Sequence, residues 1–181
     1  MKVTETKLKG CFILEPTLFN DDRGYFYESF NTKQFNEAIG RVVHFVQDNQ
    51  SYSTFGVVRA LHYQIGKFAQ AKLVRVLSGN VLDVAVDLRT NSLTYGQYFA
   101  IELSAENKKQ LFIPKGFAHG FSVLSDTAEF FYKCDNYYNK EAEGGIIFND
   151  PNLKINWQLS VDQIKVSEKD LELPTFEYAK L

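Results

Sequence analysis

Short apolar runs separated by compact turn signals limit the fold of this chain more than any other feature of its sequence. Clusters of Gly, Asn, Asp, Ser and Pro stand between the runs. Many short strands joined by turns are typical of an antiparallel sandwich or barrel, so we predict a mainly β fold. The expected strands, rich in Val, Ile, Phe and Tyr, are residues 10–16, 56–64, 72–77, 81–88, 98–103, 110–113, 120–124 and 129–135.

Residues 81–88 show the strand pattern most clearly. One face of this strand carries only aliphatic side chains, and the other carries two carboxylates, Asp83 and Asp87. Successive side chains of a strand point to opposite faces. A carboxylate inside a barrel is costly unless it is paired. Asp83 and Asp87 are therefore expected to point to water or to line a polar pocket.

Two helices are expected among the strands. Residues 32–39 follow Asn31, a good N-cap, and end before Gly40, which suits a helix C-terminus. Residues 160–164 begin with a serine cap and carry an acid in the first turn, where the helix dipole favours it. Residues 167–171 are expected to add one further turn.

Composition argues against several classes of protein. Lys and Arg total 20 and Asp and Glu total 22, and this net charge of −2 does not favour non-specific nucleic-acid binding. No apolar run approaches the ~20 residues that span a bilayer, and the N-terminus lacks the apolar core of a signal peptide. Cys11 and Cys134 are too few for a disulfide framework and are expected to be buried thiols. We expect one domain over residues 1–181, in the cytoplasm, without a membrane or nucleic-acid partner.

The strand at residues 56–64 carries two polar side chains among apolar ones, Arg59 and His62. On strict alternation they point to opposite faces, so a shared site requires a bulge or a strong twist between them. Taken alone, His62 is more often a satisfied core histidine and Arg59 a solvated surface residue. Lys72 and Tyr132 lie on other predicted strands and are the available partners.

The run Pro-Lys-Gly-Phe-Ala-His, which ends at His119, matches the second signature of the cupin barrel. In metal cupins that histidine is a ligand, together with His-x-His and Glu from an earlier strand. Here the earlier strand reads His-Tyr-Gln, so Gln64 replaces the second histidine. Two imidazoles without a third ligand do not suit a catalytic metal site. We therefore expect no metal.

Eight stretches, taken together and in order, resemble the dTDP-4-dehydrorhamnose 3,5-epimerases. They lie at residues 22–26, 47–53, 56–64, 70–76, 79–89, 113–121, 144–151 and 167–170. Ala60 is a mild departure, since the family usually has Gly there, and residues 172–181 match no pattern. The resemblance implies a jelly-roll cupin and a homodimer in which N-terminal strands join the partner's sheet. It also implies a cofactor-free enzyme that converts dTDP-4-dehydro-6-deoxy-D-glucose to dTDP-4-dehydro-L-rhamnose.

The chemistry that the resemblance implies suits four side chains. The C3 and C5 carbons of the substrate flank the C4 ketone, so removing a proton from either gives an enolate whose charge sits on the C4 oxygen. His62 suits the base, with Asp170 orienting its ring. Lys72 suits the stabiliser of the oxyanion, and Tyr132 suits the acid on the other face. Such an acid is expected to have a pKa lowered from about 10 towards neutrality.

The remaining matched positions are expected to hold the substrate. Arg23 and Arg59 suit the pyrophosphate, because a guanidinium binds phosphate oxygens in a bidentate manner. Phe26 and Phe121 are candidates for stacking on thymine or the sugar, and Asp83 for a supporting role at the pocket floor. Further nucleotide-, sugar- or substrate-contacting positions are Glu28, Gln47, Asn49, His119, Glu143 and Lys169.

Several alternatives stay open from the sequence. An epimerase that inverts only C3 or only C5, or that uses another nucleotide, would keep His62, Lys72 and Asp170 and differ in the acid or the sugar contacts. A non-catalytic cupin that binds a nucleotide sugar would have no need of the full set of four side chains. A metal-dependent cupin oxygenase or isomerase is disfavoured by Gln64.

Overall fold

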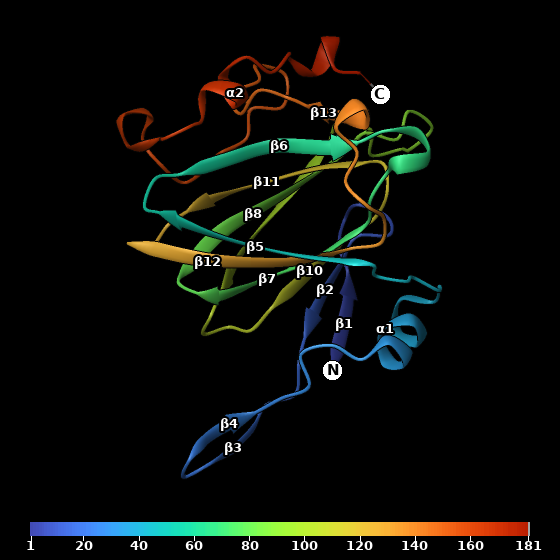
Figure 1. Cartoon of the computed structure of the whole chain (residues 1–181), viewed down its shortest axis with the longest axis vertical. Coiled ribbons are helices and arrows are strands. Elements are labelled where there is room, and N and C mark those ends of the chain that lie inside the picture. The colour runs from blue at the N-terminus through green and yellow to red at the C-terminus, as the bar shows by residue number, and fades with distance from the viewer. Residues whose placement is uncertain (181) are drawn as a thin grey trace.

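The computed structural model describes residues 1–180 and consists mainly of antiparallel β-strands, as predicted (Figure 1). Leu181, which ends the C-terminal segment without a sequence pattern, lies outside the described residues. There are two α-helices, α1 (Thr32–Ile39) and α2 (Glu168–Leu171), within this part of the chain. The strands are β1 (Lys2–Glu5), β2 (Phe12–Glu15), β3 (Phe19–Asp21), β4 (Gly24–Phe26), β5 (Gln47–Thr54), β6 (Val58–Gln64), β7 (Lys72–Ser78), β8 (Asn80–Asp87), β9 (Tyr98–Ser104), β10 (Gln110–Ile113), β11 (Phe117–Val123), β12 (Thr127–Cys134) and β13 (Glu143–Gly145).

Two sheets pack face to face and confirm the predicted jelly-roll architecture. The six-stranded sheet has the order β1-β2-β10-β7-β12-β5, and the five-stranded sheet has the order β13-β6-β11-β8-β9. Strands β3 and β4 form a separate hairpin that projects away from both sheets (Figure 1). The N-terminal strands β1 and β2 pair with each other, and β2 also pairs with β10, so both belong to the chain's own sheet.

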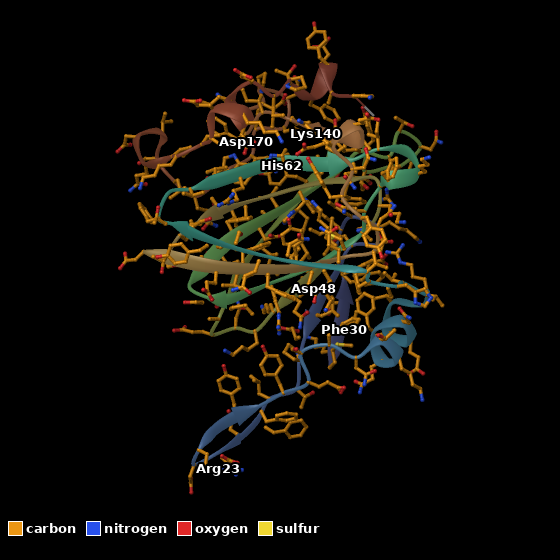
Figure 2. The ribbon with its side chains drawn as sticks, in the orientation of Figure 1. Arg23, Phe30, Asp48, His62, Lys140 and Asp170 are labelled. Atoms are coloured by element: carbon orange, nitrogen blue, oxygen red, sulfur yellow. The ribbon has the colours of Figure 1, made fainter. Side chains whose placement is uncertain are left out.

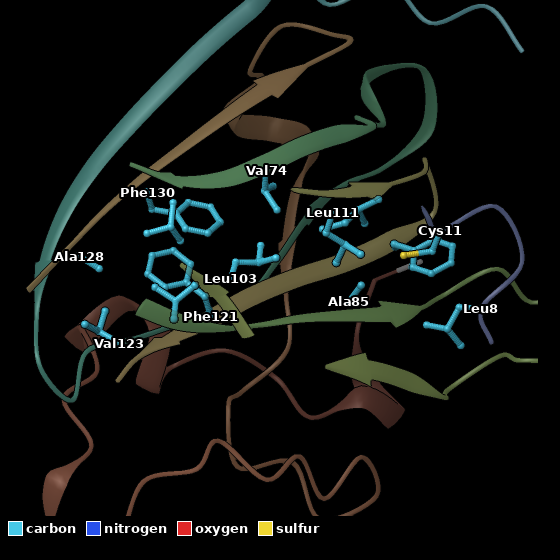
Figure 3. Packing of buried hydrophobic residues seen from close by; sticks show 14 residues of the cluster. Leu8, Cys11, Val74, Ala85, Leu103, Leu111, Phe121, Val123, Ala128 and Phe130 are labelled. Atoms are coloured by element: carbon cyan, nitrogen blue, oxygen red, sulfur yellow. The ribbon is translucent and has the colours of Figure 1, made fainter. Parts of the chain in front are cut away.

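Three apolar clusters hold these layers together. The first lies between the two sheets and includes Phe121 and Phe130 (Figure 3). The second lies on the outer face of the five-stranded sheet, where the C-terminal segment covers it, and includes Trp157. The third packs Phe35 of α1 against the outer end of the six-stranded sheet, on Phe112. Burial of apolar surface in these layers is the main stabilising contribution to the fold.

Strand β8 alternates as predicted, with its aliphatic face in the cluster beneath the C-terminal segment. On its other face, Asp83 and Asp87 are fully buried rather than exposed to water. Asp83 contacts His119, and Asp87 accepts hydrogen bonds from Arg89 and from two hydroxyl groups of the following loop. Each carboxylate therefore has a partner, as burial favours, although Oδ1 of Asp83 accepts no hydrogen bond within residues 1–180.

The helix predicted at residues 32–39 is confirmed, whereas the helix predicted at residues 160–164 is wrong. The Asn31 side chain accepts a hydrogen bond from the Gln34 backbone (3.1 Å), and Gly40 adopts φ 69° at the other end of α1. Residues 160–164 form only a single 3₁₀ turn, Val161–Gln163, because the flanking chain is extended. Among the described residues, no helix is long and apolar enough to cross a membrane.

Candidate active site

A pocket of about 340 Å³ lies between the two sheets. One wall comes from β5, β7 and β12 of the six-stranded sheet, and the other comes from β6, β11 and β13 of the five-stranded sheet. This position places side chains from opposite sheets around one space. The expected site residues that line it are Gln47, Asn49, Arg59, His62, Lys72, His119, Phe121, Tyr132 and Glu143.

Strand β6 contains a bulge that turns both of its polar side chains towards the pocket. Against β11, His62 pairs with His119 but Arg59 pairs with Phe121, so the register shifts by one residue between them. The sequence-based requirement for a bulge is therefore confirmed. Gly120 permits the close approach of the two strands, since a Cβ there would lie 2.7 Å from the carbonyl oxygen of Arg59.

His62 is held by a carboxylate from the other end of the chain. Its Nε2 lies 2.8 Å from Oδ1 of Asp170, and Figure 2 shows Asp170 beside His62 above β6. The His62 side chain is 31% exposed, whereas that of Asp170 is 8% exposed. Ser167 caps α2 by accepting a hydrogen bond from the Asp170 backbone (3.2 Å). With Nε2 donating to Asp170, Nδ1 is the nitrogen left to accept a proton.

Lys72 of β7 and Tyr132 of β12 lie on the wall opposite His62. The Lys72 Nζ atom is 5.8 Å from the centre of the Tyr132 ring. Burial lowers the pKa of the Lys72 ammonium. Burial also raises the pKa of Tyr132, so the expectation of a lowered pKa is wrong for the protein without substrate. The phenol is therefore protonated at neutral pH and able to donate.

His119 and Phe121 of β11 form the floor of the pocket. The His119 Nε2 atom lies 2.8 Å from Oδ2 of Asp83, and this Asp83 oxygen is fully buried beneath the ring. Burial lowers the pKa of His119, although the Asp83 carboxylate acts in the opposite direction. Phe121 stacks on Phe130 with ring centres 4.3 Å apart. Asp83 thus reaches the pocket only through His119.

Hydrogen-bonded polar side chains form the rim. The Gln47 amide donates to Asn49 (3.0 Å) and accepts from the Tyr138 backbone (3.1 Å). The Tyr138 hydroxyl donates to Glu143 (3.0 Å), and the Lys169 ammonium donates to the same carboxylate (2.8 Å). Burial alone would raise the pKa of Glu143, but the bonds from Lys169 and Tyr138 outweigh it and lower this pKa. Lys169 therefore reaches the pocket through Glu143.

Besides Lys169, three expected substrate contacts do not line this pocket within one chain. Arg23 lies at the tip of the β3–β4 hairpin, far from the sheets (Figure 2), and pairs with Asp21 (2.6 Å). Phe26 is 70% exposed on the same hairpin, so it is not a core residue of this chain. Glu28 accepts a hydrogen bond from the Asn31 side chain (2.7 Å) next to α1.

Gln64 occupies the place of the second histidine of metal cupins, and its amide is fully used in hydrogen bonds to the backbone. It donates to the carbonyls of Phe68 (2.8 Å) and Tyr137 (3.1 Å) and accepts from the Asn139 backbone (2.6 Å). This side chain therefore supports the loop that carries Tyr138. Among residues 1–180, no group of three or more His, Cys, Asp and Glu side chains is placed to hold a metal ion.

Several residues that line the pocket were not predicted from the sequence, although strand alternation could have identified some of them. Phe130 and Cys134 flank Tyr132 at strand spacing, so alternation on β12 places them on the same face. Gln50 and Ser51 of β5 lie in the matching stretch 47–53 but were not singled out beside Gln47 and Asn49, and the loop after β12 gave no signal. The further lining residues are Gln50, Ser51, Tyr63, Gln64, Gln70, Phe130, Cys134 and Tyr138.

Comparison with known proteins agrees with this geometry. The family model described as dTDP-4-dehydrorhamnose 3,5-epimerase matches residues 5–178. A protein of that name from Shigella flexneri is 54% identical over 94% of this chain and 93% of its own length. The crystal structure of the Elizabethkingia anophelis enzyme has a TM-score of 0.95 and 58% identity, covering 98% of this chain and 97% of that one. A Legionella pneumophila structure in complex with dTDP-4-keto-L-rhamnose has a TM-score of 0.93 and 48% identity, covering 98% and 93%. The chain therefore belongs to the dTDP-4-dehydrorhamnose 3,5-epimerase family.

Proposed function

We propose that this protein inverts C3 and C5 of dTDP-4-dehydro-6-deoxy-D-glucose to give dTDP-4-dehydro-L-rhamnose. The observation that carries the proposal is the placement of His62 and Tyr132 on opposite walls of one pocket, on β6 and β12. Inversion at a carbon requires a proton to leave one face of the sugar and another to arrive at the opposite face. A sugar ring seated between the two sheets would meet both groups.

His62 is the proposed base. Its Nε2 donates to Asp170, so Nδ1 takes the proton from C3 or C5 and the carboxylate stabilises the imidazolium that forms. Both carbons flank the C4 ketone, so each abstraction places negative charge on the same C4 oxygen. One base and one stabilising group can therefore serve both inversions.

Lys72 is the proposed partner of the C4 oxygen, and Tyr132 is the proposed acid. Burial disfavours the Lys72 ammonium, but an enolate oxygen beside it supplies the opposite charge that favours this form. Burial keeps Tyr132 protonated, as a donor must be before it acts. The Lys72 Nζ atom lies 5.8 Å from the centre of the Tyr132 ring, so the two side chains can contact adjacent atoms of one sugar.

The nucleotide would extend towards the Arg59 side of the pocket. The Arg59 Nε donates to the Ser53 hydroxyl (3.1 Å), which aims the guanidinium along β5 and fits a pyrophosphate. Gln47, Asn49 and Glu143 would contact the sugar or nucleoside from the rim, and Lys169 would hold Glu143.

A homodimer would complete the nucleotide site. The hairpin of β3 and β4 carries Phe19, Tyr25 and Phe26, whose side chains are 63%, 56% and 70% exposed. An isolated two-stranded hairpin is at best marginally stable in water, so a second surface must cover these rings. We propose that the hairpin packs on a second copy and presents Arg23, Phe26 and Glu28 to its pocket. The exchanged element would then be the hairpin, since β1 and β2 pair within their own chain.

Subunit mixing tests the dimer. Arg23→Ala and His62→Ala subunits, each inactive as a homodimer, are mixed after partial denaturation. If Arg23 acts in the partner's pocket, heterodimers contain one site with both residues intact, and activity returns. Lack of recovery, with heterodimers verified by native mass spectrometry, would contradict a shared site.

The function is tested by proton NMR of dTDP-4-dehydro-6-deoxy-D-glucose with the protein in D₂O. Deuterium at both C3 and C5 is expected. Deuterium at one carbon alone would favour a mono-epimerase, and dTDP binding without exchange would favour a different sugar or a cupin that only binds. A nucleotide-sugar substrate and two free, buried cysteines also favour the cytoplasm as the place where this single domain acts.

A further inference from the structure

The segment after α2, residues 172–180, is bonded directly to one neighbour of His62 on β6, Tyr63, and through residues 146–147 to the other, Leu61. We call it the C-terminal strap. On one side, Leu61 exchanges two backbone hydrogen bonds with Ile146 (2.8 and 3.0 Å), and the next residue, Ile147, donates to the carbonyl of Pro174 (2.9 Å). On the other side, the Tyr63 hydroxyl donates to the carbonyl of Lys180 (2.8 Å). The strap therefore connects to the strand that carries the proposed base directly at Tyr63, and indirectly at Leu61 through residues 146–147.

Further contacts fix the strap along its length. Leu173 packs on Gly145, where a Cβ would lie 2.5 Å from the Leu173 methyl group, and Gly145 is the cross-strand partner of His62. The Phe176 backbone donates to Asp150 (2.7 Å), a carboxylate that is 2% exposed. The Phe176 ring also packs against Tyr95 at 5.2 Å between ring centres.

Helix α2 cannot hold Asp170 by itself. It spans only Glu168–Leu171, and a helix this short is unstable in water without tertiary contacts. Upstream, the chain is tied to the sheet at Lys165, which exchanges backbone hydrogen bonds with Gly56 and Val58 (2.8 and 2.9 Å). Downstream, the first ties are those of Leu173 and Pro174. Within the turn, the Lys169 ammonium also donates to Glu143 (2.8 Å). The backbone of the turn that carries Asp170 is thus anchored on both sides, upstream at Lys165 and downstream at the strap.

We propose that the C-terminal strap sets the position of Asp170 against His62, so that Leu173, Pro174 and Phe176 are positioning residues for the base. The proposal rests on the proposed role of His62. A shift of the strap would lengthen the 2.8 Å contact between Nε2 and Oδ1, and the imidazole would lose its fixed tautomer. Substrate contacts on the opposite wall would stay in place.

The test uses full-length Phe176→Ala, with Phe176→Leu as the conservative variant and Tyr178→Ala as the matched control. Tyr178 belongs to the same strap, but its side chain is 76% exposed. We expect Phe176→Ala to lower kcat by about tenfold, the scale found for partners that orient a functional histidine, with KM within twofold of the unchanged protein. Phe176→Leu should recover most of the activity, and Tyr178→Ala should match the unchanged protein.

A double variant that also changes Asp170 distinguishes a positioning role of Phe176 from general destabilisation of the protein. In an Asp170→Ala background, Phe176→Ala should cause no further loss of kcat, because the side chain through which it acts has already been removed. Losses that multiply in the double variant would overturn the proposal, as would a rise in KM at constant kcat.

A second readout needs no turnover. Nitrogen-15 NMR of His62 in the substrate-free protein should show the proton on Nε2, and Phe176→Ala should mix the two tautomers. An unchanged tautomer would overturn the proposal even if the protein proved not to be an epimerase. Conversely, Phe176→Ala could mix the two tautomers while the unchanged protein exchanges no proton at C3 or C5. That result would support the proposed role of the strap and reject the proposed function. Should Phe176→Ala not fold, truncation after Leu173 is measured in the same way.

Discussion

Asp87 allows a stability prediction whose size follows from its contacts. The carboxylate is fully buried and accepts hydrogen bonds from the Arg89 side chain (2.8 and 2.7 Å), from Ser92 (2.6 Å) and from Thr94 (2.7 Å). Burial alone would raise the pKa of Asp87, but these bonds outweigh it and lower the pKa from 3.8 to about 2. We predict that Asp87→Asn destabilises the fold.

The magnitude follows from linkage between protonation and folding. At about 1.4 kcal/mol per pH unit, the lowered pKa corresponds to roughly 2.5 kcal/mol at neutral pH. The Arg89 side chain is 33% exposed, so solvent screens part of this interaction, and we expect about 1–2 kcal/mol to be lost in Asp87→Asn. Because the folded-state pKa lies below the unfolded value, this stabilisation is complete above about pH 4 and is lost as the pH falls through about 2.

The assay is urea denaturation at fixed protein concentration, followed by fluorescence of the only tryptophan, Trp157, which is 4% exposed. The difference in free energy of unfolding between the unchanged protein and Asp87→Asn should be about 1–2 kcal/mol at pH 7 and about half of that at pH 3. Asp21→Asn is the matched control. Asp21 accepts bonds from the backbone N, Nε and Nη2 of Arg23, as Asp87 does from those of Arg89, but its side chain is 52% exposed. It should not change stability measurably. A difference for Asp87→Asn that is equal at pH 7 and pH 3 would refute the reasoning.

Four further variants test the site. His62→Ala should abolish deuterium exchange at C3 and C5 by NMR while dTDP still binds by calorimetry; normal turnover would reject His62 as the base. Tyr132→Phe should impair net inversion more than exchange, because the base can return its proton to the same face, and equal losses would indicate a structural role. Arg59→Ala should weaken dTDP binding by at least about tenfold, as expected for a charge-assisted contact, and an unchanged Kd would remove it from the phosphate site. Gly120→Ala would place a Cβ 2.8 Å from that of Ala60, so thermal unfolding should show a loss of about 1–3 kcal/mol; an unchanged Tm would mean that the bulge tolerates it.

The predictable parts of this fold are those with local signals. Alternation identified β8, and the Asn31 and Gly40 caps identified α1 to the residue. Strand β5 was missed because its run is almost entirely polar, includes Asp and Asn, which are depleted in strands, and lies at a sheet edge. The segment 160–164 was expected to be helical, but tertiary packing of the extended chain on either side limits it to one 3₁₀ turn.

The residue types of the site and the family were readable in the sequence, because matching motifs occur in order along almost the whole chain. The sequence alone could not show which of these side chains lie close together in the folded chain. The bulge in β6 decides that Arg59 and His62 share a pocket, and 108 residues of chain separate His62 from the carboxylate that contacts it. The depth of burial, which raises the pKa of Tyr132 instead of lowering it, is likewise a property of packing. Local signals determine which strands and turns form, whereas distances and pKa values depend on which strands from distant parts of the chain meet around the same space.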